Sequence, residues 1–401
     1  MKTYDFIIVG AGVVGLTIAR TLAERRYGSV LILEKEPELG RHASGRNSGV
    51  LHTGIYYSTD SLKAKLCGEG ARLLFEYASE RGIQVRKTGK VILPTGPGQE
   101  RDLQSLYDRA RANGAHVEWM DQSRLRQIEP EARACERALY SPETAVIDSL
   151  GVLSSLEREN TTLGCALIKS APVLKINSHE CQIVTPNETF QYGYLINTAG
   201  LYADRIAHWL GVGRRYRILP FKGIYKKLKP EVAKRFCGAI YPVPDLGMPF
   251  LGVHLTKTIS NEVLVGPTAI PALGRENYGI FEGMQLKDSS QILADLSRMW
   301  FGNSDGFRSL VRNELKQYSP HAFLKSAQVL APNLKRDDLA PGQAMVGIRA
   351  QLIDCTKMKL VMDFVIEHGE KSTHVLNAIS PAFTSSLAFA KLVVEGLPKN
   401  L

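Results

Sequence analysis

The sequence predicts an α/β protein with a Rossmann-like FAD-binding domain and a second, substrate domain built on a mixed or antiparallel sheet covered by helices. Three observations support this prediction. A strand, a glycine-rich turn, a helix and a second strand fill the first 35 residues, similar buried strands return near residues 195 and 346, and strand-like runs broken by proline and glycine lie between them. We expect residues 1–85, 145–212 and 340–401 in the first domain and residues 86–144 and 213–339 in the second.

Composition limits the classes of function. With 401 residues and 44% apolar content, the chain can bury the cores of two domains. Its net charge of +10 is spread along the chain without a basic block, so we expect no nucleic-acid partner. Six scattered cysteines without CxxC spacing predict reduced thiols and no metal site. Without a run of about 18 apolar residues, the protein is expected to be cytoplasmic, either free or peripheral at the inner face of a membrane.

Hydrophobic periodicity predicts the elements in order. Buried strands are expected at residues 4–9 and 30–33 around a helix at 14–26, and helices at 61–81 and 101–113 flank a strand at 90–94. A helix capped by Asp148 precedes short strands at 166–176, 182–185 and 194–197. An antiparallel sheet is expected over 217–267 and helices over 288–300 and 307–330. Strands at 346–353, 360–367 and 373–378 and a helix at 382–395 complete the chain.

The strongest motif is Gly10-Ala11-Gly12-Val13-Val14-Gly15, between the first strand and the first helix. Its glycines permit a tight turn, close approach of a pyrophosphate, and packing of helix on strand. Glu34, followed by Lys35, ends the next strand at the spacing of an acid that binds ribose hydroxyls. This unit predicts a dinucleotide site but leaves NAD and FAD open. The later strand that ends in Ala199 and Gly200, and the interrupted layout of the domain, favour FAD.

Several longer motifs identify a family resemblance. They are His42-Ala43-Ser44-Gly45-Arg46-Asn47-Ser48-Gly49-Val50-Leu51-His52-Thr53-Gly54-Ile55-Tyr56-Tyr57, Ser61-Leu62-Lys63-Ala64-Lys65, Met248-Pro249-Phe250-Leu251-Gly252-Val253-His254-Leu255-Thr256, Gly347-Ile348-Arg349-Ala350-Gln351 and Asn377-Ala378-Ile379-Ser380-Pro381-Ala382. Through them the chain resembles, nearly end to end, the L-2-hydroxyglutarate oxidase and dehydrogenase family within the D-amino acid oxidase-like flavoproteins. The resemblance implies FAD, and oxidation of a 2-hydroxy acid by hydride transfer to flavin N5. The expected substrate is L-2-hydroxyglutarate and the expected product 2-oxoglutarate, with oxygen or a membrane quinone as electron acceptor.

The resemblance also implies cofactor contacts outside the glycine-rich turn. These are expected at Ser44, Asn47, Ser48, Gly49, Val173, Arg349, Ser380, Pro381, Ala382 and Thr384. One position departs from the family pattern, because Arg46 stands where family members carry histidine. A fixed cation there either recognises a different acid group or contacts the cofactor.

Oxidation of a 2-hydroxy acid requires a base for the hydroxyl proton and cations for the carboxylates. Histidine suits the first task, so the base is His52 or His254; the alternative is a buried histidine bonded to backbone. Arg349 is expected to bind the substrate carboxylate or the flavin ring. Lys222 or Arg46 is the candidate for a second carboxylate, and Tyr241 is a weaker site candidate.

Two other functions remain open from the sequence. Enzymes of the same superfamily oxidise amines and amino acids, and such substrates need no dedicated base when they arrive neutral. A flavin-binding partner protein without turnover would keep the glycine-rich motif and lose its substrate-side residues. The two histidines in family-like motifs favour the oxidation of an alcohol over both alternatives.

Overall fold

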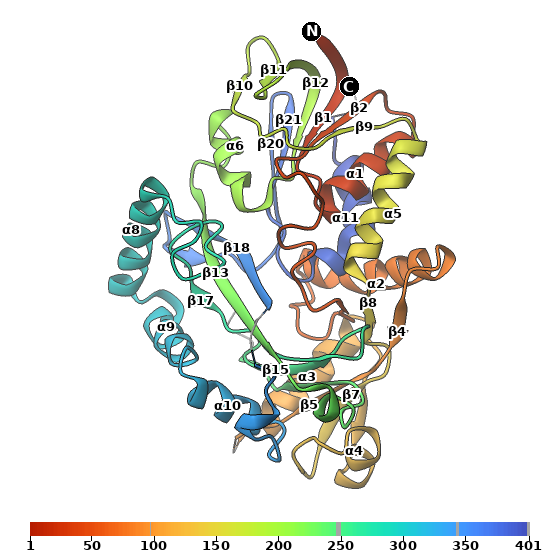
Figure 1. The fold of residues 1–401 in the computed structure, drawn as a ribbon, viewed down its shortest axis with the longest axis vertical. Coiled ribbons are helices and arrows are strands. Elements are labelled where there is room, and N and C mark those ends of the chain that lie inside the picture. Colours follow the sequence, from red (N-terminus) through yellow and green to blue (C-terminus); the bar gives the residue numbers. More distant parts are fainter. Residues whose placement is uncertain (97, 246–249, 342–344, 399–401) are drawn as a thin grey trace.

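A computed structural model describes residues 1–96, 98–245, 250–341 and 345–398. The predicted motif residues Met248 and Pro249 lie outside these ranges. Figure 1 shows two large sheets, one in the upper and one in the lower part of the molecule, with helices packed against them. This α/β arrangement confirms the predicted fold class.

The first sheet contains eight strands. Its order is β20 (Val365–Gly369), β21 (Ser372–Asn377), β12 (Thr189–Asn197), β1 (Lys2–Val9), β2 (Val30–Leu33) and β9 (Ala166–Ile168), while β10 (Lys175–Asn177) and β11 (Gln182–Val184) extend it beside β12. The strands from β21 to β9 run parallel. Because parallel strands need crossover connections, the sheet is assembled from chain segments far apart in sequence.

Helices cover both faces of this sheet. On β1, Phe6 and Ile8 join the core beneath α1 (Val13–Glu24), α2 (Leu62–Glu80), α5 (Ser149–Thr162) and α11 (Ala382–Glu395), whereas Ile7 and Val9 join the core on the side of η1 (Gly200–Tyr202) and α6 (Ala203–Trp209). Successive side chains of a strand point to opposite faces. The continuous apolar run therefore marks a strand buried on both sides, as predicted.

The second sheet contains ten strands. Its order is β19 (Lys359–Leu360), β18 (Met345–Asp354), β13 (Tyr216–Lys227), β16 (Val263–Gly266), β15 (His254–Lys257), β14 (Ala239–Pro242), β5 (Lys90–Leu93), β7 (Ala138–Ser141) and β6 (Glu118–Met120), with β17 (Ile270–Pro271) also on β13. A smaller sheet joins β3 (Val50–Leu51), β8 (Ala145–Ile147) and β4 (Val85–Lys87).

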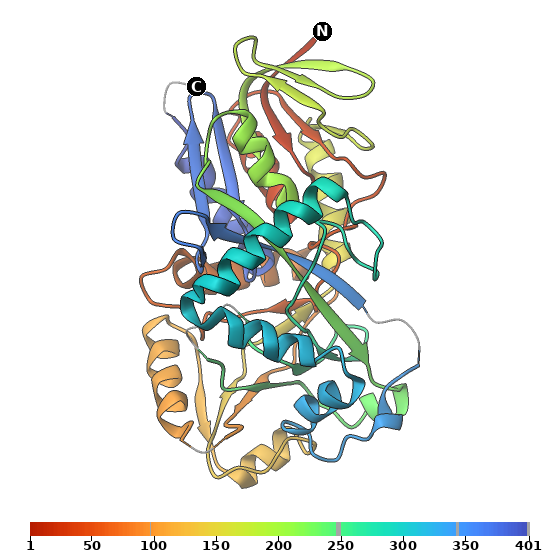
Figure 2. The same ribbon diagram turned by 90° about the vertical axis from the view of Figure 1, so that its left-hand side faces the viewer.

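Helices also cover the second sheet. Figure 2 shows α8 (Leu286–Gly302), α9 (Phe307–Lys316) and α10 (Pro320–Gln328) lying across it. The remaining helices are α3 (Glu100–Ala112), α4 (Gln122–Ile128), α7 (Pro230–Ala233), η2 (Ser304–Gly306) and η3 (Arg336–Asp338). Among the described residues, none of the helices has the length and apolar content needed to cross a membrane.

Three predicted elements were wrong in extent. The helix expected over 307–330 is two helices, because Pro320 starts a new helix with Ser319 as its cap. The strand expected over 360–367 is interrupted, so that β19 and β20 are separate strands. The strand at 166–176 is likewise β9 and β10. The predicted domain division stays a prediction; β18, placed in the FAD domain from the sequence, pairs along its length with β13 of the ten-stranded sheet.

The interruption between β19 and β20 places a carboxylate at the start of α2. Asp363 accepts hydrogen bonds from the backbone N–H groups of Leu62 (2.7 Å) and Lys63 (3.0 Å). The first N–H groups of a helix have no partner within the helix, and a negative charge there is favourable. Asp363 therefore anchors α2 to a segment 300 positions later in the chain.

Replacing Asp363 by Ala should lower the free energy of unfolding by about 1–2 kcal/mol, since two helix N–H groups lose their acceptor. Urea denaturation followed by circular dichroism measures the change. Asp60→Ala is the matched control, because Asp60 is an exposed carboxylate near the same helix whose described contact is the Ser58 hydroxyl. A loss as small as that of the control, within about 0.5 kcal/mol, would contradict the anchoring role.

Candidate active site

One cavity of about 640 Å³ extends from the parallel sheet to the ten-stranded sheet. This volume lies within the usual range for ligand sites. The cavity is lined by most of the residues predicted from the sequence, namely Gly10, Ala11, Gly12, Val14, Glu34, Lys35, Ser44, Arg46, Asn47, Ser48, His52, Val173, Ala199, Gly200, Tyr241, His254, Arg349, Ser380, Pro381, Ala382 and Thr384. Gly15, Gly49 and Lys222 do not line it.

The glycine-rich turn connects β1 to α1 at one end of the cavity. Gly10 has φ +104°, and a Cβ at this position would lie 2.7 Å from the Thr198 carbonyl oxygen. A Cβ on Gly15 would collide with the carbonyl oxygen of Gly10. These two glycines therefore allow α1 to start directly against the ends of β1 and β12. The N-terminus of α1 faces the cavity without an acidic residue in its first turn, which suits an anionic ligand.

Glu34 lies beside this turn, where β2 ends. Its carboxylate is buried and accepts hydrogen bonds from the backbone N–H groups of Ala11 (2.8 Å) and Glu36 (3.0 Å). These bonds hold the carboxylate at the wall of the cavity. A carboxylate offers about four acceptor positions, so it keeps capacity for the hydroxyl groups of a ribose.

A polar network closes the cavity near Glu34. His42 bonds Tyr278 (2.6 Å) and Glu36 (2.9 Å), and Lys35 forms ion pairs with Glu276 (2.7 Å) and Glu36. The oxygen atoms of Glu36 and Glu276 and the His42 ring lie close enough to hold a cation, but the Lys35 ammonium already binds both carboxylates. His42 is therefore held in place by bonds to Tyr278 and Glu36.

The polar loop after β2, residues 40–49, packs against the glycine-rich turn. The Ser44 hydroxyl accepts a hydrogen bond from Val13 N–H (3.0 Å), and the Asn47 side-chain oxygen accepts one from Gly49 N–H (2.8 Å). Gly49 has φ +70°, and a Cβ there would lie 2.5 Å from the Ile147 carbonyl oxygen. Gly49 therefore allows the loop to pack on β8, although it does not itself line the cavity.

Arg46 is held by backbone atoms and an aromatic ring. Its guanidinium donates to the carbonyl oxygens of Arg41 (2.7 Å) and Val346 (3.3 Å) and lies 4.2 Å from the centre of the Tyr278 ring. These contacts connect the polar loop to β18 and to the loop before α8. The guanidinium is therefore part of the cavity wall, and it is hydrogen-bonded to the protein itself.

The two candidate bases lie in the deep part of the cavity. His254 Nδ1 is 2.9 Å from the Gly252 carbonyl oxygen, and its ring stacks on Tyr241 at 3.8 Å between centroids. His52 Nδ1 is buried without a hydrogen-bond partner among the described atoms. Burial, aided by the positive charge of Lys90, lowers the pKa of each histidine to about 3. Both imidazoles are therefore neutral at ordinary pH and able to accept a proton.

Arg349 brings a buried positive charge to the same region. It lies on β18 opposite Phe221 of β13, with its guanidinium 4.7 Å from the centre of the Phe250 ring. Burial lowers the pKa of Arg349, while the nearby Tyr225, Tyr57 and Glu314 oppose this shift. Arginine stays protonated even so, and its planar donors suit a carboxylate.

Lys222 is not brought to the cavity. Side chains alternate along β13, so Phe221 and Gly223 face the cavity and Lys222 faces away from it. Its ammonium donates to the carbonyl oxygen of Gly279 (2.5 Å) and to the side chain of Asn277 (3.2 Å). The structure thus gives Lys222 a place in positioning the loop before α8, in contrast to the predicted contact with a carboxylate.

The first turn of α11 contacts the backbone around His52. The Thr384 hydroxyl donates to the Val50 carbonyl oxygen (3.2 Å) and accepts from His52 N–H (3.2 Å). This pair of bonds fixes the backbone of His52 against a helix more than 330 positions away. The sequence analysis did not identify Glu314 and Tyr225, which line the cavity, or Lys90, which lies near it. For Lys90, the one available signal was the presence of a lysine in a predicted buried strand.

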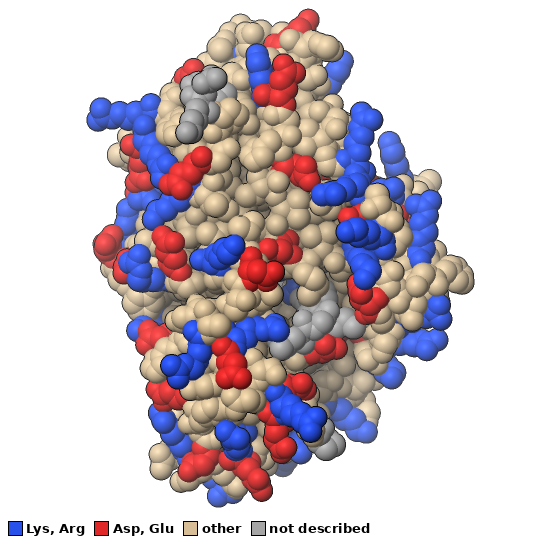
Figure 3. All heavy atoms as spheres, turned by 180° about the vertical axis from the view of Figure 1, so that it is seen from behind, with Lys and Arg blue, Asp and Glu red and all other residues tan. Residues whose placement is uncertain are grey.

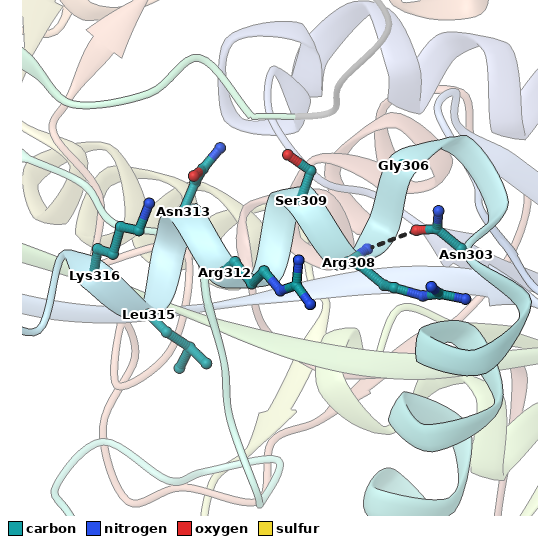
Figure 4. Close-up of a pocket in the computed structure, with 8 residues that line it drawn as sticks. All are labelled: Asn303, Gly306, Arg308, Ser309, Arg312, Asn313, Leu315 and Lys316. Atoms are coloured by element: carbon teal, nitrogen blue, oxygen red, sulfur yellow. Dashed lines mark hydrogen bonds between the residues drawn. The ribbon is translucent and has the colours of Figure 1, made fainter.

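A second hollow lies on the outer face of α9, away from this cavity. Figure 4 shows that Ser309 and Asn313 point to one side of α9 and Arg312 to another, and that Asn303 bonds the backbone of Arg308. The Arg308 side chain is bonded to the carbonyl oxygens of Trp300 and Phe301. These groups do not converge on one point. On the face drawn in Figure 3, acidic and basic side chains are interspersed over much of the surface.

A parallel sheet with this turn, a buried ribose-type acid and a cavity that ends at neutral histidines and a buried arginine defines a dinucleotide-dependent oxidoreductase. Residues 5–396 match the model of the FAD dependent oxidoreductase family. L-2-hydroxyglutarate dehydrogenases are similar over 98% of this chain: the mitochondrial enzymes of Caenorhabditis elegans (37% identical, 93% of its length) and Homo sapiens (36%, 88%), and that of Escherichia coli K12 (32%, 92%).

Solved structures show the same fold. The L-alpha-glycerophosphate oxidase of Mycoplasma pneumoniae, with FAD bound, has a TM-score of 0.78 at 21% identity, covering 98% of this chain and 94% of its own. Glycine oxidase of Geobacillus kaustophilus has a TM-score of 0.71 at 20% identity, with the same coverage. The chain therefore belongs to the FAD-dependent oxidoreductase family, among the relatives of L-2-hydroxyglutarate dehydrogenase. FAD as the cofactor and an enzyme as the class of protein are both confirmed.

Replacing Gly15 by Ala should abolish FAD retention, because the new Cβ collides with backbone of the glycine-rich turn. The ratio of flavin to protein absorbance after gel filtration measures the loss. Gly68→Ala is the matched control, since Gly68 lies within α2 and a Cβ there meets nothing within 4 Å. The control should keep its flavin and gain up to about 1 kcal/mol of stability. Full flavin content in Gly15→Ala would contradict the assignment.

Proposed function

We propose that the protein oxidises L-2-hydroxyglutarate to 2-oxoglutarate. The observation that carries the proposal is the convergence of two neutral histidines and one buried arginine on the cavity that also contains the dinucleotide turn. A 2-hydroxy acid needs one group to take the hydroxyl proton and one to bind the carboxylate. The names of the relatives, which span nearly the whole chain, support L-2-hydroxyglutarate as the acid.

The proposed roles follow from position. His52 or His254 takes the hydroxyl proton, and the engagement of His254 Nδ1 with Gly252 leaves its Nε2 for this purpose. Arg349 binds the carboxylate beside the reacting carbon and orients the substrate. Tyr241 supports His254 by ring stacking. FAD, when bound, would supply the hydride acceptor for the alcohol carbon.

The residues present fit FAD. The N-terminus of α1, with Gly10, Ala11, Gly12 and Val14, would hold the pyrophosphate, and Glu34 the adenosine ribose. Because Ser44 and Asn47 are already bonded within the loop, they would shape the wall that faces the flavin. The other proposed contacts are Lys35, Ser48, Val173, Ala199, Gly200, Arg349, Ser380, Pro381, Ala382 and Thr384, which line the cavity.

Two observations bear on the alternatives. The fold is shared with glycine oxidase, so the fold alone does not distinguish alcohols from amines. The substrate side is intact, with Arg349, His52 and His254 all at the cavity, which disfavours a flavin-binding partner without turnover. The relatives named for a 2-hydroxy acid have much higher identity than the amine oxidases, and this favours the alcohol.

The electron acceptor and the location are further parts of the proposal. Oxygen or a membrane quinone reoxidises the flavin, and the protein is cytoplasmic, with peripheral contact at the inner face of a membrane if quinone is used. The exposed Leu286, Phe301, Arg312 and Lys316 on α8 and α9 support such a contact, since apolar and basic groups suit an anionic lipid surface. Reoxidation rates with oxygen and with a soluble quinone distinguish the two acceptors.

Anaerobic mixing with L-2-hydroxyglutarate should bleach the flavin, and glycine and other 2-amino acids should not. His52→Gln should slow flavin reduction by about 10² or more if His52 is the base, because the hydroxyl proton loses its acceptor. Stopped-flow absorbance measures both. His254→Gln is the paired variant, and the larger loss identifies the base. A flavin that stays oxidised with L-2-hydroxyglutarate would refute the proposed substrate.

The rate of flavin reduction at saturating substrate should show no loss near pH 6.5 as the pH falls. Burial lowers the pKa of His52 and His254 to about 3, so both stay in the proton-accepting form well below the ordinary histidine value. Stopped-flow measurements from pH 5 to 9 check this. A rate that halves near pH 6.5 would show that the base titrates like an exposed histidine.

A further inference from the structure

Lys90 is a buried lysine that forms no ion pair with a carboxylate among the described residues. Its side chain is 1% exposed, and its ammonium nitrogen has no hydrogen-bond partner among the described residues. Lys90 lies on β5 opposite Ala239 of β14, and Tyr241 follows Ala239 on the same face. This face carries an apolar cluster that includes Ile92 and Tyr56. The ammonium is thus placed where an apolar side chain is expected.

Aromatic rings are the main contacts of this ammonium. The nitrogen lies 4.6 Å from the centre of the Tyr56 ring and 5.2 Å from that of Tyr241. Such contacts compensate only part of the cost of burying a charge without a hydrogen-bond partner. A group kept at a cost to stability, and beside a ligand cavity, is a candidate for function.

Lys90 is separated from the cavity by the side chains that line it. The Tyr241 ring, whose centre lies 5.2 Å from the ammonium, stacks on His254, and both residues line the cavity. The positive charge also acts on His52 and His254 strongly enough to lower their pKa values. A charge this close acts across a poorly screened interior on any ion bound in the deep part of the cavity.

The proposed substrate carries two carboxylates, and only one has a cation so far. Arg349 is assigned to the carboxylate beside the reacting carbon. Lys222 faces away from the cavity, and Arg46 is bonded to two backbone carbonyl oxygens at a different part of the wall. The two cations predicted for the second carboxylate are therefore engaged elsewhere.

We propose that Lys90 is the specificity-determining cation for the dicarboxylic acid, a buried ammonium whose counter-ion is the distal carboxylate of the bound substrate. The assignment rests on the proposed oxidation of a 2-hydroxy dicarboxylic acid. The Lys90 ammonium attracts the carboxylate electrostatically across the side chains of Tyr241 and Tyr56. It favours dianionic over monoanionic substrates of the same length.

Binding of the dianion should then depend on pH. Burial lowers the pKa of Lys90 to about 7, and the neighbouring groups are Tyr56, Tyr241, His52, His254 and Cys67. The two tyrosines and the thiol are neutral there because burial raises their pKa values, and the histidines are neutral because burial lowers theirs. A bound anion raises the pKa of Lys90. Affinity is therefore full below pH 7 and falls as pH rises through 7.

The test measures binding of glutarate, a dicarboxylate that cannot reduce the flavin, and of butyrate, its monocarboxylate counterpart, to the oxidised holoenzyme. Perturbation of the flavin spectrum gives Kd at pH 6 and pH 8.5. For the wild-type protein, glutarate should bind about tenfold more weakly at pH 8.5, whereas butyrate should change little.

Lys90→Met should weaken glutarate binding at pH 6 by roughly tenfold or more and remove its pH dependence, with butyrate unaffected. Lys90→Arg should keep tight binding at both pH values, because arginine stays charged. Lys63→Met is the matched control: burial, aided by the charge of Arg349, also lowers the pKa of Lys63 to about 7, but Lys63 lies by the Tyr57 and Phe364 rings. It should keep the pH dependence.

Stability gives an independent readout. If Lys90 had only a structural role, Lys90→Met would lower the melting temperature; the proposal expects an unchanged or higher one, since the buried charge is removed. Equal glutarate binding and equal pH dependence in wild type and Lys90→Met would overturn the assignment, as would loss of the pH dependence in Lys63→Met. Flavin bleaching by L-2-hydroxyglutarate in the wild-type protein tests the proposed function separately.

Discussion

The close approach of α1 to the ends of β1 and β12 is the constraint on which the rest of the site depends. Gly10 and Gly15 make this approach possible, and the Glu34 carboxylate fixes the turn through the N–H of Ala11. The turn in turn orders the polar loop, because Ser44 bonds the first residue of α1. The polar loop leads directly to His52, the first candidate base. The position of the glycine-rich turn therefore determines where the residues that face the substrate lie.

Charge in the deep part of the cavity is strongly unbalanced. Arg349 lines this part and Lys90 is buried behind it, while Glu314 is the described carboxylate whose charge acts on Arg349. Burial of the Lys90 charge without a described ion-pair partner opposes folding, and the positive potential also makes the cavity receptive to anions. Burial, aided by the same positive potential, keeps the two histidines neutral. One arrangement of charges thus favours an acidic substrate and preserves a base for its oxidation.

Local sequence patterns predicted the fold more completely than they predicted the site. The turn from Gly10 to Gly15 with Glu34 is a contiguous signal, and its strand, helix and acid lie where the spacing places them. Lys222 could not be placed, because a one-residue difference in the register of β13 decides whether it faces the cavity or the loop before α8. The sequence pattern places Asp363 inside a strand and cannot reveal its partners at the start of α2, which lie 300 positions away.

The strand and helix closest to the C-terminus have a central position. β21 pairs with β12 inside the parallel sheet, and α11 packs with α1 and α2 in the same core. Thr384 on α11 also bonds the backbone of the first candidate base. During synthesis the N-terminal turn emerges first, but its sheet and its helical cover are complete only when residues 372–395 have left the ribosome. The N-terminal segments alone therefore cannot complete the sheet that carries the dinucleotide turn, because that sheet needs the strand and helix of residues 372–395.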